Sequence, residues 1–272
     1  MSGTVRAEST AGVAVIELDN PRKRHALTRE MFTRLVDLLH AADVDEQVRV
    51  VLIRSDGPIF CSGLDLDELV ASHEGITTDA VADLNRMLDT SAAVCGAIAE
   101  SRKPVIVAAQ GPCIGIGTLM FLSCDIGLMT PGARLQLPKA LLGAGYFAPL
   151  LGKLLGPRRA KSLLLSPEVF AIEAAEAQQW GLAAAVLPPA GFREEAQAYA
   201  EGLARVPAGW LQLQKAGVDS PAAALSVREA IRAGAQLDAL AHSTGFARKA
   251  AQDAFGRTAE APDAAMADGE GA

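Results

Sequence analysis

The stretch that decides the fold is Lys103–Ile126, which reads KPVIVAAQGPCIGIGTLMFLSCDI. After its proline, Val105–Ala108 is rich in β-branched residues, as expected of a buried strand. Gln110–Thr118 then carries three glycines, and the apolar residues that follow suffice for a short buried helix. The pattern predicts a strand, a glycine turn and a helix, and its polar interruptions argue against a membrane-spanning segment.

A second strand with a glycine turn lies upstream. Val48–Arg54 (VRVVLIR) is predicted as a buried strand, and Phe60–Leu66 (FCSGLDL) follows it. Glycine lets a ligand approach the backbone closely, and the first turn of a helix offers unpaired N–H groups. Two such amides directed at one oxygen form an oxyanion hole, where removing a donor costs about 2.7–4 kcal/mol. Taken alone, such a turn more often reflects close packing, and neither has the spacing of a dinucleotide-binding or phosphate-binding glycine loop.

The first part of the chain alternates strand and helix patterns. Val13–Leu18 is a strand candidate, and Thr28–Ala42 is predicted as a helix with Thr28 as its N-cap. A polar helix is expected over roughly Thr78–Glu100. Because this alternation is typical of layered folds, we predict an α/β core over residues 1–190.

The character of the sequence changes after this core. Ala-rich helical patterns separated by prolines predict a helical region over residues 191–258. Residues 259–272 are small and acidic with nothing to pack, so a disordered tail is expected there. The expected C-terminal helices are Arg193–Arg205, Ala208–Val218, Ala222–Leu240 and Thr244–Phe255.

Composition excludes several classes of protein. The 272 residues are 50% hydrophobic, which excludes global disorder, and the net charge of −7 argues against a sequence-independent nucleic-acid binder. The N-terminal segment MSGTVRAEST has no apolar run, and the sequence carries no metal, flavin or nicotinamide signature. We therefore expect a cytoplasmic protein that binds no membrane, nucleic acid or metal. The cysteines are expected to be buried free thiols; they are Cys61, Cys95, Cys113 and Cys124.

Four motifs in this order resemble the crotonase family, the enoyl-CoA hydratase/isomerase superfamily. They are Asn20–Thr28 (NPRKRHALT), Phe60–Leu69 (FCSGLDLDEL), Lys103–Ile126, and Ala171–Pro188 (AIEAAEAQQWGLAAAVLP). The resemblance, which runs from about residue 10 to residue 258, implies a spiral of ββα units with a helical C-terminal trimerisation region. It implies a homotrimer or hexamer, and an acyl-CoA thioester whose CoA is part of the substrate, so that no separate cofactor is expected.

The resemblance also implies where the thioester lies. Its carbonyl oxygen is expected between the backbone N–H groups of Leu64 and Ile116. The segment Ser62–Leu66 is expected to cradle the adenine end of CoA, and the basic turn that precedes the first helix is expected to meet the phosphates. The residues expected to contact CoA are Arg22, Arg24, Ser62, Leu64, Asp65 and Leu66, although Asp65 is also a candidate turn cap.

The sequence departs from the family at the acid–base positions. Hydratases of this family use two glutamates to activate and position water. Those positions correspond here to Leu119 and Lys139, neither of which is acidic. Because each lost general acid or base costs about 10²–10⁴-fold, efficient hydration is not expected.

Few other side chains are candidates for chemistry. Tyr146 corresponds to a tyrosine of the methylmalonyl-CoA decarboxylase branch, or it lines an acyl pocket. Lys139 is a candidate for holding a substrate carboxylate, or it points to solvent. His25 is expected to cap a turn, and whether His73 or His242 reaches the site stays open.

Three functional hypotheses follow. The first is an enzyme, a lyase or isomerase of fatty acid metabolism, that stabilises a thioester enolate; decarboxylation of a malonyl-type thioester is its simplest form because loss of CO₂ needs no base. The second is a non-catalytic acyl-CoA carrier. The third is a weak hydratase or isomerase that uses Tyr146, Lys139 or a histidine.

Overall fold

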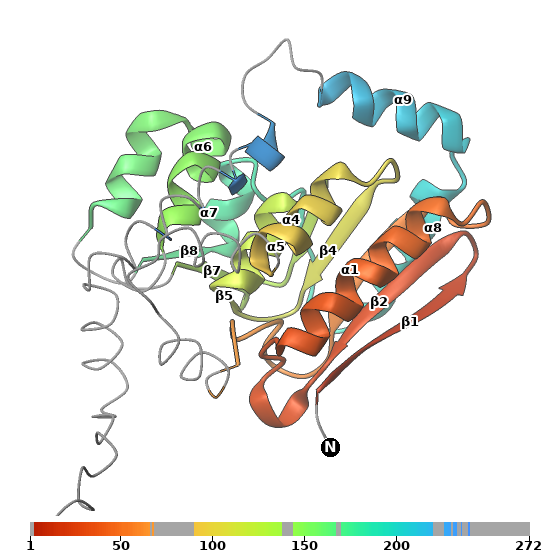
Figure 1. The fold of residues 1–272 in the computed structure, drawn as a ribbon, viewed down its shortest axis with the longest axis horizontal. Helices are drawn as coiled ribbons and strands as arrows, with labels where there is room; N and C mark the ends of the chain where they lie inside the picture. The colour runs from red at the N-terminus through yellow and green to blue at the C-terminus, as the bar shows by residue number, and fades with distance from the viewer. Residues whose placement is uncertain are drawn as a thin grey trace, which may run out of the picture.

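The computed structural model describes residues 3–65, 67, 90–137, 144–166 and 170–219, together with 226–229, 231, 232, 235 and 239. In this part of the chain, helices pack against a six-stranded sheet and a three-stranded sheet (Figure 1). The predictions made for Leu66, His73, Lys139, His242 and the acidic tail concern residues outside the described ones.

The larger sheet is mostly parallel, with one antiparallel pair at its edge. In order across the sheet, its strands are β1 (Thr4–Thr10), β2 (Val13–Asp19), β3 (Val50–Ser55), β4 (Val105–Ala109), β6 (Ile126–Met129) and β9 (Ala185–Val186). Only the β1–β2 pair is antiparallel among these. The strands predicted from Val13–Leu18, Val48–Arg54 and Val105–Ala108 are therefore confirmed.

Strand β1 has no clear signal in the sequence. Most of its residues are exposed, so it lacks the apolar run that identifies the other strands. It is held by a tight hairpin in which Thr10 pairs with Val13, and Ala11 and Gly12 both have positive φ angles, of 50° and 80°. Two left-handed residues match the right-handed twist of the paired strands, which explains how a short turn joins them.

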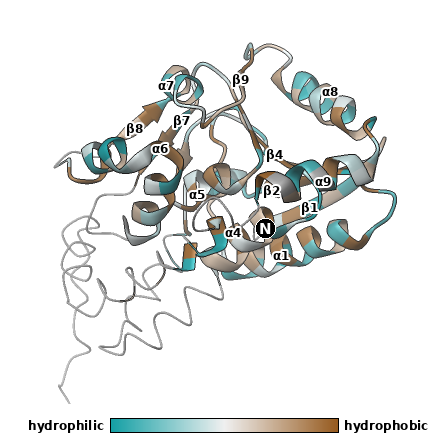
Figure 2. Ribbon diagram, turned by 90° about the horizontal axis from the view of Figure 1, so that it is seen from above, coloured by the Kyte–Doolittle hydropathy of each residue, from teal (hydrophilic) through white to brown (hydrophobic). Residues whose placement is uncertain are grey.

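Alternate residues of the strands pack on opposite faces of the large sheet. Val51 and Ile53 belong to the main core, whereas Leu52 and Ile106 belong to a second core beneath the other face. Figure 1 shows α1 in front of the sheet, and Figure 2 shows that α1 and α8 carry both hydrophilic and hydrophobic stretches. The main core is covered by α1 (Arg29–Val44), α4 (Ser91–Glu100) and α5 (Ile116–Ser123), and the second by α8 (Phe192–Ala204).

Helix α1 begins as its sequence predicts. The Thr28 side chain accepts a hydrogen bond from Met31 N at 3.2 Å, which is the expected N-cap interaction. Met31, Leu35 and Leu39 are buried against the sheet, whereas Leu38 is only half-buried. The helix therefore fixes the position of the turn that precedes it.

A small sheet lies beside the N-terminus of α5. Its strands, in order, are β5 (Cys113–Ile114), β7 (Arg134–Gln136) and β8 (Ala171–Glu173). Strands β5 and β7 are parallel, and β7 and β8 are antiparallel. The nearby helical elements are η2 (Ala144–Tyr146), α6 (Phe147–Leu164), which breaks at Gly156, and α7 (Ala174–Gln179).

The C-terminal region is helical where it is described. Helices α8 and α9 (Ala208–Val218) confirm two of the predicted helices. Parts of the predicted helix Ala222–Leu240 are helical, and Ile231 and Ala235 are buried there. Among the described helices, none is both long enough and apolar enough to cross a bilayer.

Candidate functional site

The two glycine turns lie side by side. We call Phe60–Asp65 the first bend and Gly111–Ile116 the second bend. Phe60 N donates to Pro112 O at 3.2 Å, and Ile114 N donates to Cys61 O at 2.9 Å. These hydrogen bonds join the backbone of one bend to that of the other. The backbones of Cys61 and Cys113 form an isolated parallel β-bridge between the two bends. The two bends are therefore a single structural unit.

The contact between the bends leaves no room for a side chain at Gly117, which directly follows the second bend. A Cβ at Gly117 would lie 2.8 Å from Cys61 Cβ and 2.9 Å from Cys61 O. Since real Cβ atoms do not approach other atoms so closely, glycine is required there for the N-terminus of α5 to reach the first bend. A Cβ on Gly115 would lie 3.9 Å from Gly63 Cα, so the residues that precede Leu64 and Ile116 also come close together.

The amide of Leu64 lies near the end of the first bend, and that of Ile116 ends the second bend. Leu27 bridges to Leu64 through its neighbours, because Leu27 N donates to Gly63 O and Asp65 N donates to Leu27 O, each at 2.9 Å. Ile116 is the first residue of α5, so its N–H has no acceptor within the helix. Among the described residues, neither N–H donates a backbone hydrogen bond.

The basic turn packs directly on the first bend. This turn, Asn20–His25, contains the short helix η1 (Pro21–Lys23). Ser62 N donates to Arg24 O at 3.0 Å, and Ser62 Oγ donates to Lys23 O at 2.9 Å. Arg22 and Arg24 are exposed, and the described residues provide no ion pair to either. The structure thus brings together the predicted CoA contacts Arg22, Arg24, Ser62, Leu64 and Asp65.

Lys23 differs from the arginines on either side of it. Its Nζ lies 2.8 Å from Asp65 Oδ1 and 2.7 Å from Asp67 Oδ2. The hydrogen bond to Asp65, and then that to Asp67, raises the pKa of Lys23. This pairing was not predicted from the sequence, although its signal was a lysine in the basic turn and the aspartates Asp65 and Asp67. Within the basic turn, the positive charge of Lys23 is therefore already paired with carboxylates of the protein.

Asp65 has a structural role at the end of the first bend. It is only 1% exposed, and its Oδ1 also accepts a hydrogen bond from Asp67 N at 3.0 Å. This bond to the residue two positions later confirms the interpretation of Asp65 as a turn cap. Because its carboxylate is paired with Lys23, Asp65 is a poor candidate for a general base.

The second bend is held by the small sheet. Thr118 Oγ1 donates to Cys113 O at 2.7 Å and lies 3.0 Å from Gln136 O. Gly115 N also donates to Gln136 O, at 3.3 Å. Strands β5 and β7 thus fix the direction of the first turn of α5, and with it the N–H of Ile116. Neither Thr118 nor Gln136 was predicted from the sequence to have a role in the site.

The acid–base positions carry no described carboxylate. Leu119 is 3% exposed and lies in the main core. Tyr146, at the end of η2, is 5% exposed and belongs to the same core. Its predicted role, like that of Lys139, stays a prediction.

All four cysteines are free thiols, as predicted; Cys61, Cys95 and Cys113 are also buried as predicted, whereas Cys124 is only partly buried. Burial raises the pKa of Cys61, Cys95 and Cys124 to about 12, and raises that of Cys113 well above its ordinary value. Such thiols are not ionised at neutral pH and are poor nucleophiles. The described residues also contain no cluster of side chains that could hold a metal ion.

Solved structures share this fold. The crystal structure of an enoyl-CoA hydratase from Mycobacterium smegmatis matches with a TM-score of 0.81 at 25% identity, covering 93% of this chain and 90% of that one. An enoyl-CoA hydratase/isomerase from Xanthobacter autotrophicus Py2 matches with a TM-score of 0.79 at 25% identity, covering 92% and 93% of the two chains. The protein therefore has the crotonase fold, as its motifs predict.

Sequence comparisons lead to the same class. The sequence model of the enoyl-CoA hydratase/isomerase family matches residues 8–257. A putative enoyl-CoA hydratase of Thermus thermophilus is 31% identical over 205 residues, which cover 75% of this chain and 79% of that protein. A 4-chlorobenzoyl coenzyme A dehalogenase of an Arthrobacter species is 27% identical over 206 residues, covering 75% and 73%. The chain belongs to the enoyl-CoA hydratase/isomerase family.

Proposed function

We propose that this protein binds an acyl-CoA thioester and stabilises negative charge on its carbonyl oxygen through the N–H groups of Leu64 and Ile116. The observation that supports this most directly is the contact between the two bends, in which Ile114 N donates to Cys61 O at 2.9 Å. Two backbone amides on one rigid unit need no reorganisation when charge develops on the oxygen, which is the basis of an oxyanion hole.

The coenzyme part of the ligand would lie along the basic turn. Arg22 and Arg24 are exposed beside Ser62, and Lys23 is already paired with Asp65. We therefore assign the CoA phosphates to the two arginines, because guanidinium groups bind phosphate in a bidentate manner. The adenine end would contact the segment Ser62–Leu66. Assembly into a homotrimer or hexamer is part of the same proposal.

The chemistry we favour is enolate formation without a general base. Leu119 is apolar and Asp65 is ion-paired, so the described part of the site supplies no carboxylate to activate water. In decarboxylation of a malonyl-type thioester, the bond to the carboxyl carbon breaks, and its electron pair passes to the α-carbon and the thioester oxygen. CO₂ leaves, and a proton from solvent completes the product. The two amides stabilise the enolate in this step.

Two other functions remain as candidates. A non-catalytic acyl-CoA carrier is favoured by the same lack of a described carboxylate. Hydration is favoured by the names of relatives, including the putative enoyl-CoA hydratase of Thermus thermophilus, whereas the dehalogenase of the Arthrobacter species acts by name on a different thioester.

The test measures binding and turnover on the same samples. Crotonyl-CoA, methylmalonyl-CoA and butyryl-CoA are titrated calorimetrically, and products are identified by mass spectrometry. We expect all three to bind and only methylmalonyl-CoA to lose CO₂. Binding of all three without turnover would leave the carrier function. Rapid hydration of crotonyl-CoA would contradict the argument from Leu119, and no binding at all would refute the proposal.

A further inference from the structure

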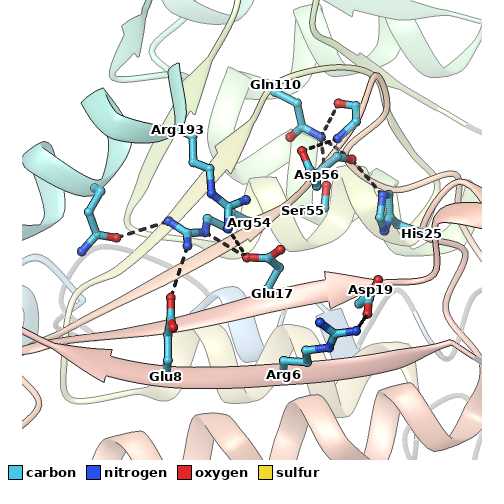
Figure 3. A network of polar contacts seen from close by, with 12 residues as sticks. Arg6, Glu8, Glu17, Asp19, His25, Arg54, Ser55, Asp56, Gln110 and Arg193 are labelled. Atoms are coloured by element: carbon cyan, nitrogen blue, oxygen red, sulfur yellow. Dashed lines mark hydrogen bonds and ion pairs between the residues drawn. The ribbon is translucent and has the colours of Figure 1, made fainter. Parts of the chain in front are cut away.

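A buried histidine connects the basic turn to the loop that leads into the first bend. His25 is 4% exposed and has a left-handed backbone, with φ of 56°. Its Nδ1 accepts a hydrogen bond from Asn20 N at 3.2 Å, and its Nε2 lies 2.8 Å from Asp56 O (Figure 3). Because a backbone N–H can only donate and a carbonyl can only accept, Nδ1 is the acceptor and Nε2 the donor in these two contacts.

The same loop is held from its other side by Gln110. We call Asp56–Ile59 the linker loop. Gln110 Nε2 lies 3.2 Å from Asp56 O, 3.0 Å from Gly57 O and 3.2 Å from Ile59 O, so the carbonyls of the linker loop converge on one amide group. Figure 3 shows Asp56 between His25 and Gln110. The carbonyl of Asp56 is therefore shared by donors from the basic turn and from the end of β4.

The linker loop also touches the backbone of the second bend. A Cβ at Gly111 would lie 2.0 Å from Pro58 O, so only glycine allows this approach. Phe60 follows the linker loop directly and begins the first bend. A displacement of the loop would therefore be passed to the Leu64 amide, which is only four residues further along the chain.

We propose that His25 is a positioning residue, which holds the linker loop so that the Leu64 and Ile116 amides point at the same oxygen. Both of its bonds end on backbone atoms, one in the basic turn and one in the linker loop. His25 thus connects the turn that would bind the CoA phosphates to the bend that would bind the thioester. Binding at one end then stabilises the geometry needed at the other. This inference rests on the proposed function.

Two substitutions separate the roles of the two imidazole nitrogens of His25. His25→Asn keeps an acceptor near the position of Nδ1 and tolerates the left-handed backbone, but it has no donor that reaches Asp56 O. His25→Gln places an amide nitrogen near the position of Nε2 and restores that donor. His40→Asn is the matched control, because His40 is an exposed histidine on α1 outside the proposed site.

The readout is the infrared carbonyl stretch of butyryl-CoA labelled with ¹³C at the thioester, recorded free and bound to the full-length protein. Parent and His40→Asn should shift the stretch to lower frequency, as polarisation of the carbonyl requires. His25→Asn should lose most of this shift and bind about tenfold more weakly, the equivalent of one hydrogen bond. His25→Gln should recover the shift, with melting temperatures close to that of the parent.

The outcomes distinguish a failure of the positioning role from a failure of the proposed function. No shift in the parent protein would refute the two-amide site itself. A normal shift in the parent and an equal one in His25→Asn would overturn the positioning role alone, as would a loss in His25→Gln as large as in His25→Asn. Should His25→Asn not fold, Gln110→Met releases the linker loop from its other side. In the Gln110→Met variant, a reduced shift of the carbonyl stretch would support the inference, and a full shift would overturn it.

Discussion

The contact between Gly117 and Cys61 makes Gly117→Ala a direct test of how tightly the two bends are packed. The added Cβ would lie 2.8 Å from Cys61 Cβ, 2.9 Å from Cys61 O and 3.3 Å from Cys61 Sγ. Two of these three atoms belong to the backbone or are fixed to it, so the helix or the first bend must move. Overpacking of this kind costs about 1–3 kcal/mol. Replacing glycine by alanine within a helix regains about 0.5–1 kcal/mol.

Gly152→Ala is the control, because Gly152 lies within α6 and a Cβ there meets nothing within 4 Å. The difference between the two variants cancels the gain in helix propensity and isolates the packing cost. We expect the free energy of unfolding of Gly117→Ala to lie about 1–3 kcal/mol below that of Gly152→Ala. The measurement is urea unfolding at 25 °C and a fixed protein concentration. Equal stability of the two variants would show that the bends are not in tight contact, and the reasoning about the amide pair would fail with it.

Three further predictions concern the scaffold. Thr28→Ala removes the cap that accepts from Met31 N and should lower the free energy of unfolding by about 1 kcal/mol, measured in the same urea assay; an unchanged value would mean that the cap contributes nothing. Since burial raises the pKa of Cys61 and Cys95 to about 12, a thiol reagent at pH 8 should modify these two thiols far more slowly in the native protein than in the urea-unfolded one, and equal rates at them would contradict this burial. Burial alone would raise the pKa of Asp43, but hydrogen bonds from Arg102 and Ser101 outweigh it and hold that pKa below the ordinary 3.8. The ionised form is therefore favoured by folding, and its contribution is present above the unfolded pKa and lost as pH falls through the folded pKa. Asp43→Asn should thus lower the melting temperature at pH 7 and have little effect near pH 3; an effect that is the same at both values would contradict this linkage.

The parts of the fold that the sequence predicts are those with a local signal. Helix α1 has a cap at Thr28 and a repeating apolar face, and β3 and β4 are continuous apolar runs, so each is visible without knowledge of its neighbours. Strand β1 is different, because its residues are mostly exposed and it exists through pairing with β2. The short strands β5, β7 and β8 depend on each other in the same way.

The same distinction applies to the candidate site. Glycine turns can be found locally, and the resemblance to the crotonase family supplied the expectation that they meet. Neither source contained the bond from Lys23 to Asp65, which joins residues 42 positions apart, or the convergence of His25 and Gln110 on Asp56 O. Long-range polar pairs of this kind are decided by tertiary geometry, so a sequence pattern cannot specify them. The roles predicted for Leu66, Lys139 and Tyr146 stay predictions.

The packing of the two bends does not depend on the side chain of Leu119, one of the two positions that correspond to the glutamates of the hydratases. The bends are joined by backbone bonds such as Ile114 N to Cys61 O, and α5 is anchored by Thr118 and by the carbonyl of Gln136. The side chain of Leu119 takes no part in these bonds and packs into the main core. A change at that position can therefore remove acid–base chemistry without moving either amide. For this reason the proposed binding of the thioester and the hydration of its double bond are separate properties, and the first does not imply the second.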